Sequence, residues 1–258
     1  MVDELKAARE PGQPMLERAF RVLRTLGAAD RPLSLTSLSA RSGLPKSTVL
    51  RMTRTLVGLG MLERCTEGWY TIGLGLWELA TQAPRAEEIR ATVLPSMWEL
   101  HTTIGQHVVL GVLDGTEAVV IERLSAQGAV KTLYRLGGRL PLHATAVGQC
   151  LLANAPIGLQ EQVLAGRLVT APENEAMCSQ RLRTRLAAVR NDGVAVVSHV
   201  MPEGHTAVAA PVLDGQGRVR AALAVIVPSP GCNVVALRAA VTASCHALNR
   251  AIRDLPRR

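Results

Sequence analysis

Residues 35–60 read LTSLSARSGLPKSTVLRMTRTLVGLG, and their helical spacing and turn residues predict the architecture of the N-terminal part of the chain. Ser34 or Thr36 can cap a short helix, and Gly43 ends it, because glycine adopts the left-handed backbone that closes helices. Pro45 suits the first turn of the next helix. The apolar residues of that helix recur at helical spacing, at Val49, Met52, Leu56 and Leu59. The stretch therefore predicts a helix, a short turn and a second helix.

The segments on both sides of this pair complete a small domain. An amphipathic helix is predicted over residues 15–26. Its apolar residues at helical spacing are Leu16, Phe20, Leu23 and Leu26. After the pair, residues 61–64 and 69–72 read as two short strands around a turn that contains Gly68. Three helices followed by a glycine-tipped hairpin predict a winged helix-turn-helix domain, with the hairpin as its wing.

The second helix of the pair carries a polar face suited to DNA. Ser47, Arg51 and Arg54 recur at i, i+4 and i+7, away from the apolar stripe. Arginine can pair with guanine through two hydrogen bonds, and a helix fits the major groove. The alternative is an ordinary solvated helix face. The residues predicted to contact DNA are Thr36, Ser37, Lys46, Ser47, Thr48, Arg51 and Arg54 in the helices, and Arg64, Gly68 and Trp69 in the wing.

Composition agrees with a protein that binds a polyanion. The 258 residues carry 29 Lys plus Arg against 21 Asp plus Glu, a net charge of +8, and the excess of cations favours nucleic acid or anionic lipid as a partner. Aromatic side chains are too scarce to build a base-stacking platform for single strands, since there are 3 Trp, 2 Tyr and 1 Phe. A helix that reads a groove needs none of them.

Sequence features also bear on the compartment. The first fifteen residues hold no apolar signal segment, and no run of 18 apolar residues follows, so we expect a soluble cytoplasmic protein without a membrane partner. The 5 cysteines are odd in number and never form a CxxC pair, which favours reduced thiols over disulfides or zinc ribbons. We expect most of them to be small buried hydrophobes.

Beyond residue 90 the pattern alternates between strand and helix. Strands are predicted over residues 108–113, 118–124, 130–136, 194–197, 206–212 and 219–227. Helices are predicted over residues 144–153, 179–190 and 234–252. Asp114-Gly115 and Asp214-Gly215 supply turns between neighbouring strands. The expected fold class is α+β, with a DNA-binding domain over residues 1–80, a linker over 81–90 and a mixed, mainly antiparallel sheet with helices over 91–258.

Several of these stretches together resemble the IclR-type bacterial transcriptional regulators. The resemblance lies in LERAFRVLRTL (16–26), residues 35–64, YTIGLGLWELA (70–80), GGRLPLHATAVGQ (137–149) and AVAAPVLDGQGRVRAALAV (207–225). It implies a homodimer or a dimer of dimers that binds a pseudo-palindromic DNA operator. It also implies that the C-terminal domain is GAF-like and binds a small-molecule effector. We expect a repressor rather than an activator.

The resemblance also indicates where an effector would bind. Main-chain amides at Ala146 and Val147 begin the helix that holds organic acids in the family, and a helix start is a natural anion site. The family's polar side-chain positions are changed here: they correspond to Val197, His199, Val200, Ala207, Ala224 and Ile226. A small acid would leave oxygens unpaired against such a wall. We therefore expect an effector with an apolar or aromatic body. Its predicted contacts are Thr132, Leu140, Val197, Ala207, Ala224 and Ile226, with His205 as a polar contact.

Three alternatives stay open at this point. The pocket can be filled by its own side chains, which would make the protein a constitutive DNA-binding regulator. An enzyme with an accessory DNA-binding domain would need a nucleophile such as Cys150 beside His143, or a metal site. Such a metal site would use His199 and His205 with Cys178 or Cys232, but their spacing matches no metal motif. We expect no catalytic residue, no cofactor and no metal.

Overall fold

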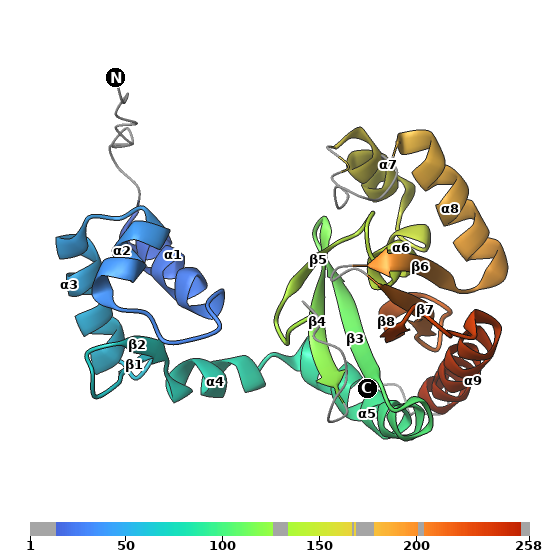
Figure 1. The fold of residues 1–258 in the computed structure, drawn as a ribbon, viewed down its shortest axis with the longest axis horizontal. Coiled ribbons are helices and arrows are strands. Elements are labelled where there is room, and N and C mark those ends of the chain that lie inside the picture. Colours follow the sequence, from blue (N-terminus) through green and yellow to red (C-terminus); the bar gives the residue numbers. More distant parts are fainter. Residues whose placement is uncertain (1–13, 126–133, 167, 169–177, 201–203, 254–258) are drawn as a thin grey trace. The chain divides into compact units, whose positions relative to one another are not determined.

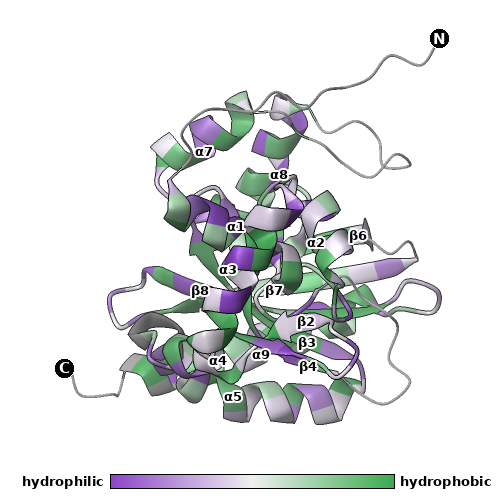
Figure 2. Cartoon of the chain, turned by 90° about the vertical axis from the view of Figure 1, so that its left-hand side faces the viewer, coloured by the Kyte–Doolittle hydropathy of each residue, from purple (hydrophilic) through white to green (hydrophobic). Residues whose placement is uncertain are grey.

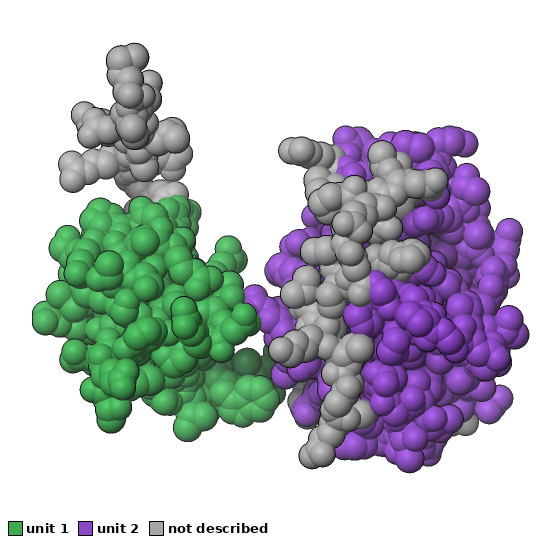
Figure 3. Space-filling model, in the orientation of Figure 1, with its two compact units in different colours: residues 1–84 green, residues 85–258 purple. Residues whose placement is uncertain are grey.

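A computed structural model describes residues 14–125, 134–166, 168, 178–200 and 204–253. The chain divides into two compact units, residues 1–84 and 85–258 (Figure 3). The division falls inside the predicted linker of residues 81–90. That segment is largely helical, because helix α4 ends at Thr81 and helix α5 begins at Pro84.

Unit 1 contains three helices, a hairpin and a fourth helix (Figure 1). Their bounds are α1 (Met15–Gly27), α2 (Leu35–Ser42), α3 (Lys46–Gly58), β1 (Leu62–Arg64), β2 (Tyr70–Ile72) and α4 (Leu74–Thr81). Ser34, not Thr36, caps α2: its side chain accepts a hydrogen bond from the Ser37 amide, 3.2 Å away. Leu33 also pairs with Tyr70, which adds an unpredicted bridge beside the hairpin. The predicted winged helix-turn-helix arrangement is confirmed.

The core of unit 1 differs from the predicted apolar stripes. Leu16 and Phe20 on α1 are 73% and 56% exposed, and the buried residues of that helix are Val22 and Leu26. Leu59 is 63% exposed because α3 ends at Gly58, so that Leu59 lies beyond the last helical turn. Helical spacing identified these helices, but Leu16, Phe20 and Leu59 lie outside the apolar core of unit 1.

Unit 2 is built around one antiparallel sheet. Its order is β5-β4-β3-β8-β7-β6. The strands are β3 (His107–Asp114), β4 (Glu117–Leu124), β5 (Arg139–Pro141), β6 (Ala195–Val200), β7 (His205–Leu213) and β8 (Val219–Pro228). The strand predicted over residues 130–136 is not found in its described part, because Tyr134 to Leu136 precede β5 as loop and turn; residues 130–133 lie outside the described ranges.

Helices cover both faces of this sheet (Figure 1). They are α5 (Pro84–Ile104), α6 (Ala146–Ala153), α7 (Ile157–Ala165), α8 (Ser179–Asp192) and α9 (Val234–Arg253). One apolar cluster fills the face under α6 and α8, and a second fills the face under α5 and α9. Helices such as α3 and α5 carry both hydrophilic and hydrophobic residues (Figure 2), as expected for helices that bury one side. Helix α7 was not predicted, because its sequence IGLQEQVLA lacks a clear polar face.

Candidate DNA-binding surface and effector site

The turn between α2 and α3 is fixed by local contacts. Gly43 ends α2 with a positive φ of 68°, as the sequence predicts. The Ser39 hydroxyl then donates to the Leu44 carbonyl oxygen at 2.7 Å, while the Leu44 side chain is buried in the core of unit 1. The direction in which α3 leaves the turn is therefore set by hydrogen bonding and by apolar packing together.

Helix α3 presents one packed face and one open face. Its buried residues are Val49, Met52, Thr53 and Leu56. Thr53 is polar and fully buried, and its hydroxyl donates to the Leu50 carbonyl at 3.1 Å, so no hydroxyl is left unsatisfied. The exposed residues include four of the predicted DNA contacts: Lys46, Ser47, Arg51 and Arg54. Thr48 is half-buried beside them.

The predicted contacts on α2 differ in their freedom. Thr36 is exposed. Ser37 takes part in the helix cap, because its hydroxyl oxygen accepts from the Ser34 hydroxyl at 3.0 Å. Ser37 therefore retains its own hydroxyl hydrogen as a donor toward an outside acceptor.

The wing is short and closed by backbone hydrogen bonds. The Cys65 amide donates to the Trp69 carbonyl at 2.8 Å, and the Gly68 amide donates to the Cys65 carbonyl at 3.0 Å. Gly68 has a φ of 77°, and a Cβ at this position would lie 3.5 Å from Arg64 Nη2. The exposed Arg64 guanidinium thus lies beside the wing turn, together with the half-buried Trp69.

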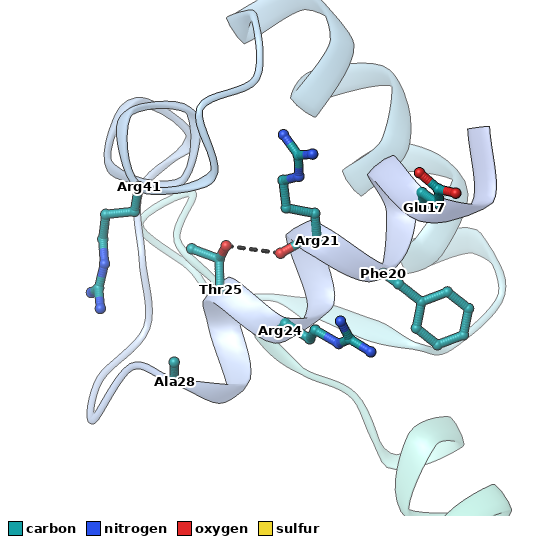
Figure 4. Close-up of a pocket in the computed structure, with 7 residues that line it drawn as sticks. All are labelled: Glu17, Phe20, Arg21, Arg24, Thr25, Ala28 and Arg41. Atoms are coloured by element: carbon teal, nitrogen blue, oxygen red, sulfur yellow. Dashed lines mark hydrogen bonds between the residues drawn. The ribbon is translucent and has the colours of Figure 1, made fainter. Parts of the chain in front are cut away.

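A second basic surface lies on α1 and α2. A recess of about 590 Å³ there is lined by Glu17, Phe20, Arg21, Arg24, Thr25, Ala28 and Arg41. Figure 4 shows Arg21 and Arg24 on α1 and Arg41 on α2; the Thr25 hydroxyl donates to the Arg21 carbonyl at 2.8 Å. Arg21 and Arg24 were not among the predicted DNA contacts. The sequence signal for this pair is their i, i+3 spacing, which places both cations on the same side of α1.

The predicted effector contacts come together under α6. Leu140, Ala146, Val147, Val197, Ala207, Ala224 and Ile226 are all buried members of one apolar cluster, and none is more than 7% exposed. His205 is 8% exposed, and the alternation of β7 places it on the same sheet face as Ala207. Thr132 lies outside the described residues. Ala146 and Val147 are the first residues of α6, whose cap is the Thr145 hydroxyl oxygen, which accepts from the Gly148 amide at 3.0 Å.

Polar residues that sequence reasoning missed border this cluster. Gln149 is 1% exposed and donates to the His143 carbonyl at 2.9 Å. Tyr134 is 3% exposed, and burial raises the pKa of its phenol. Arg123 donates from Nη1 to the Tyr134 carbonyl at 2.6 Å. The sequence contains no signal for Arg123, because its orientation depends on a register shift between Leu110 and Gly111 in the pairing of β3 with β4.

The expectation that most of the cysteines are buried is wrong. Only Cys150 and Cys245 are buried, and Cys178 is exposed, where its sulfur accepts from the Arg181 amide and caps α8. Burial raises the pKa of the Cys150 thiol far above its ordinary value and that of Cys245 to about 12. A thiol that burial keeps protonated is a poor nucleophile, which disfavours Cys150 as a catalytic residue.

Metal-binding clusters and membrane-spanning helices are absent among residues 14–125, 134–166, 168, 178–200 and 204–253. Within those ranges, no group of three or more His, Cys, Asp or Glu side chains is placed to hold a metal ion. The side chain of His199, one of the possible ligands named from the sequence, lies outside the described part of the structure. No described helix combines the length and apolar character needed to cross a bilayer.

Both units match known families of sequences. Residues 15–65 match the family described as the IclR helix-turn-helix domain, and residues 81–252 match the one described as bacterial transcriptional regulator IclR C-terminal. The second match alone covers more than half of the chain.

Individual relatives are consistent with these matches. The HTH-type transcriptional regulator XynR of Escherichia coli K12 is 33% identical over 210 residues, which cover 81% of this chain and 83% of XynR. The HTH-type transcriptional repressor AllR of the same strain is 28% identical over 222 residues, covering 85% of this chain and 82% of AllR. A crystal structure of an IclR homologue from Microbacterium hydrocarbonoxydans, complexed with 4-hydroxybenzoate, superposes with a TM-score of 0.82. That homologue is 30% identical, and the match covers 94% of this chain and 100% of the homologue. Since the helix-turn-helix unit, the sheet domain and these relatives agree, the chain belongs to the IclR family of bacterial transcriptional regulators.

Proposed function

We propose that this protein is an effector-controlled repressor whose helix α3 reads the major groove of its operator. The observation that carries the proposal is the open face of α3, where Lys46, Ser47, Arg51 and Arg54 are exposed opposite a buried stripe. Arginine forks can specify guanine there, and Ser47 can bond bases or phosphates. The name of AllR as a repressor supports the sign of regulation.

Contacts to phosphates would hold the protein in register on the duplex. Arg64 beside the wing turn and Arg41 at the recess on α2 are exposed cations outside the groove-reading face. Such contacts raise affinity without discriminating between sequences. The complete set of proposed DNA contacts is the one predicted from sequence, with Arg41 added as a phosphate contact.

A two-fold dimer would place two such helices on a pseudo-palindromic operator. Helix α4 supports this assembly, because none of its residues is buried and Leu74, Trp77 and Leu79 are 68%, 56% and 62% exposed. Apolar side chains on three positions of one helix favour an interface with a second copy. A dimer of dimers remains compatible with this contact. The protein would act on DNA in the cytoplasm, and we propose no catalytic role for it.

The effector site is proposed under α6, on the sheet face lined by Val197, Ala207, Ala224 and Ile226. The alanine side chains on this sheet face are small, which suits a ligand with a flat or slender apolar body. The homologue solved with 4-hydroxybenzoate supports an aromatic body. The closed packing of the apolar cluster favours a second candidate, a constitutive regulator whose sheet domain binds no effector.

The test of the proposal is fluorescence anisotropy of the full chain on its own upstream intergenic DNA and on scrambled DNA of equal length. Arg51→Ala removes a groove contact, and Arg183→Ala is the matched control, because Arg183 is exposed on α8 and pairs with Glu161. We expect sequence-specific binding that Arg51→Ala abolishes and Arg183→Ala leaves intact. Equal binding of both DNAs by the wild type, or an unaffected Arg51→Ala variant, contradicts the assignment of α3.

A thermal-shift screen separates the two candidates for the sheet domain. Aromatic and aliphatic small molecules that bind the folded state raise the melting temperature by mass action. An effector must also change the anisotropy on operator DNA, whereas the constitutive regulator shows neither response.

A further inference from the structure

A β-bulge turns Arg123 onto the sheet face that α6 covers. In the pairing of β3 with β4, Leu110 lies opposite Glu122 but the next residue, Gly111, lies opposite Val120. Ile121 is therefore the extra residue of the bulge. Beyond it, Arg123 lies opposite Val109, whose side chain belongs to the apolar cluster under α6, so Arg123 faces that cluster.

The same bulge places the neighbouring acid, Glu122, on the opposite face of the sheet. Glu122 lies opposite Leu110, which belongs to the cluster on the other face, under α5 and α9. There its carboxylate pairs with Arg90 Nε of α5, and its side chain is 11% exposed. Its only link to residue 123 is through the backbone, where the Arg123 amide donates to Glu122 Oε1 at 2.9 Å. Glu122 therefore does not neutralise the Arg123 side chain.

The Arg123 guanidinium has donors to spare. It is half-buried, and its side-chain hydrogen bond goes from Nη1 to the Tyr134 carbonyl, a neutral acceptor. Across the described residues, no carboxylate forms an ion pair with it: Asp114 and Glu117, the other acids of this hairpin, both pair with Arg139. Arginine carries five N–H donors in a planar fork that matches a carboxylate. A half-buried guanidinium with one neutral acceptor and no ion pair among the described residues keeps N–H donors available for an anion that binds beside the apolar cluster.

The surroundings of Arg123 define what else the anion must carry. Val109, its cross-strand neighbour, pairs in turn with Ala224 on β8, and Ile226 pairs with Ala207 on β7. The sheet face beside the guanidinium is thus a continuous floor of small or apolar side chains. A ligand whose charge reaches Arg123 would lay its remaining atoms on this floor.

We propose that Arg123 reads the charge of the effector, and that the effector is a monocarboxylate with an apolar body. The inference rests on the proposed effector site and adds the group that recognises the carboxylate. Arg123 supplies a charge-assisted hydrogen bond in place of the polar side chains that positions 197, 207, 224 and 226 lack. It therefore sets specificity between an acid and its uncharged analogue.

The experiment compares acids with their primary amides on the full chain by titration calorimetry. The probe pairs are benzoate and benzamide, phenylacetate and phenylacetamide, and hexanoate and hexanamide. At least one acid is expected to bind the wild type 10- to 100-fold more tightly than its amide, the range expected for a charged hydrogen bond. Arg123→Met should remove this preference, and Arg123→Lys should keep part of it.

Arg139→Met is the matched control, because Arg139 lies on the adjacent strand β5 but is exposed and pairs with Asp114 and Glu117. Its acid preference should equal that of the wild type. The inference is overturned if acid and amide bind the wild type equally, although binding of both would leave the effector site standing. It is also overturned if the preference survives in Arg123→Met. If no member of the panel binds, the site and the inference fall together. Should Arg123→Met fail to fold, the wild-type comparison and Arg123→Lys still decide.

Discussion

Gly73 passes so close to Gly60 that a Cβ at position 73 would lie 2.4 Å from the Gly60 carbonyl oxygen. The same Cβ would lie 3.0 Å from the backbone of Leu62 at the start of β1. The Gly73 amide also donates to the Met61 carbonyl at 3.0 Å. The segment that joins the wing to α4 therefore packs directly against the backbone of residues 60–62, which connect α3 to the wing.

Gly73→Ala is expected to destabilise unit 1 by about 1–3 kcal/mol, the range of overpacked sites, since backbone and not a side chain must move. Gly58→Ala is the matched control, because a Cβ on Gly58 meets no atom within 4 Å. Urea unfolding followed by circular dichroism measures both. Equal stability of the two variants would show that the wing can shift at no cost.

The arginines of unit 1 should separate into two kinds by their dependence on DNA sequence and on salt. Arg54→Ala on α3 should weaken operator binding by about 1–3 kcal/mol and leave scrambled DNA much less affected, because it removes a base contact. Arg41→Ala should weaken binding to operator and scrambled DNA alike. It should also reduce the slope of log affinity against log salt concentration by about 1, as the loss of a phosphate contact does. Anisotropy at several salt concentrations checks both. A change in the salt slope with Arg54→Ala, without loss of specificity, would reverse the assignment.

Much of the fold could be predicted because local patterns and the packing agree. Gly43 and Pro45 punctuate the helix-turn-helix, and Asp214-Gly215 lies at the turn between β7 and β8. The predicted apolar stripe of α1 was right for Leu23 and Leu26, which pack in the core of unit 1, and wrong for Leu16 and Phe20, which are exposed. Spacing identifies a helix more securely than it identifies which end of the helix the core covers.

The residues of the proposed effector site were predictable only in part. Val197, Ala207, Ala224 and Ile226 come together as expected, because strand alternation fixes their common face. Arg123 was missed because alternation without the bulge would pair it differently: one extra residue exchanges the faces of Glu122 and Arg123. Register and bulges depend on tertiary contacts, which a single sequence does not display.

Asp214 should make the sheet domain less stable in acid. Desolvation raises the pKa of this carboxyl, but hydrogen bonds from Arg218 and from the Gln216 amide lower it by more, so the net pKa is below its ordinary value of about 3.9. Because the folded-state pKa is depressed, its stabilisation is present above that ordinary value and is lost as the pH falls through the folded-state pKa.

Asp214→Asn is accordingly expected to cost about 1 kcal/mol at pH 7, because it weakens the hydrogen bonds to Arg218, which are 2.9 Å long from both N and Nε. Urea unfolding of variant and wild type at pH 7 and near pH 3 measures the difference. The gap should narrow at the lower pH. If the difference in unfolding free energy between wild type and variant grows in acid, the protonated Asp214 side chain stabilises the turn better than the charged one.

Helix α4 should control assembly. Trp77→Glu places a charge among the exposed apolar side chains of this helix and is expected to shift a dimer toward the 27.5 kDa monomer. Glu78→Gln on the same helix is the control, since Glu78 is already polar and exposed. Light scattering after size exclusion gives the masses. A Trp77→Glu variant that keeps the wild-type mass would place the interface elsewhere.

Gly111 on β3 should decide how closely α6 approaches the sheet. A Cβ at position 111 would lie 2.5 Å from Val147 Cγ1 but 3.8 Å from Val147 Cβ, so the conflict involves one methyl group. Gly111→Ala is therefore expected to cost about 1–3 kcal/mol and to displace the start of α6. In Gly111→Ala/Val147→Ala the methyl is gone, and the double variant should be less destabilised than the sum of the single changes. A double-mutant cycle by urea unfolding measures this coupling. Additive losses would mean that α6 is held by contacts other than the one at Gly111.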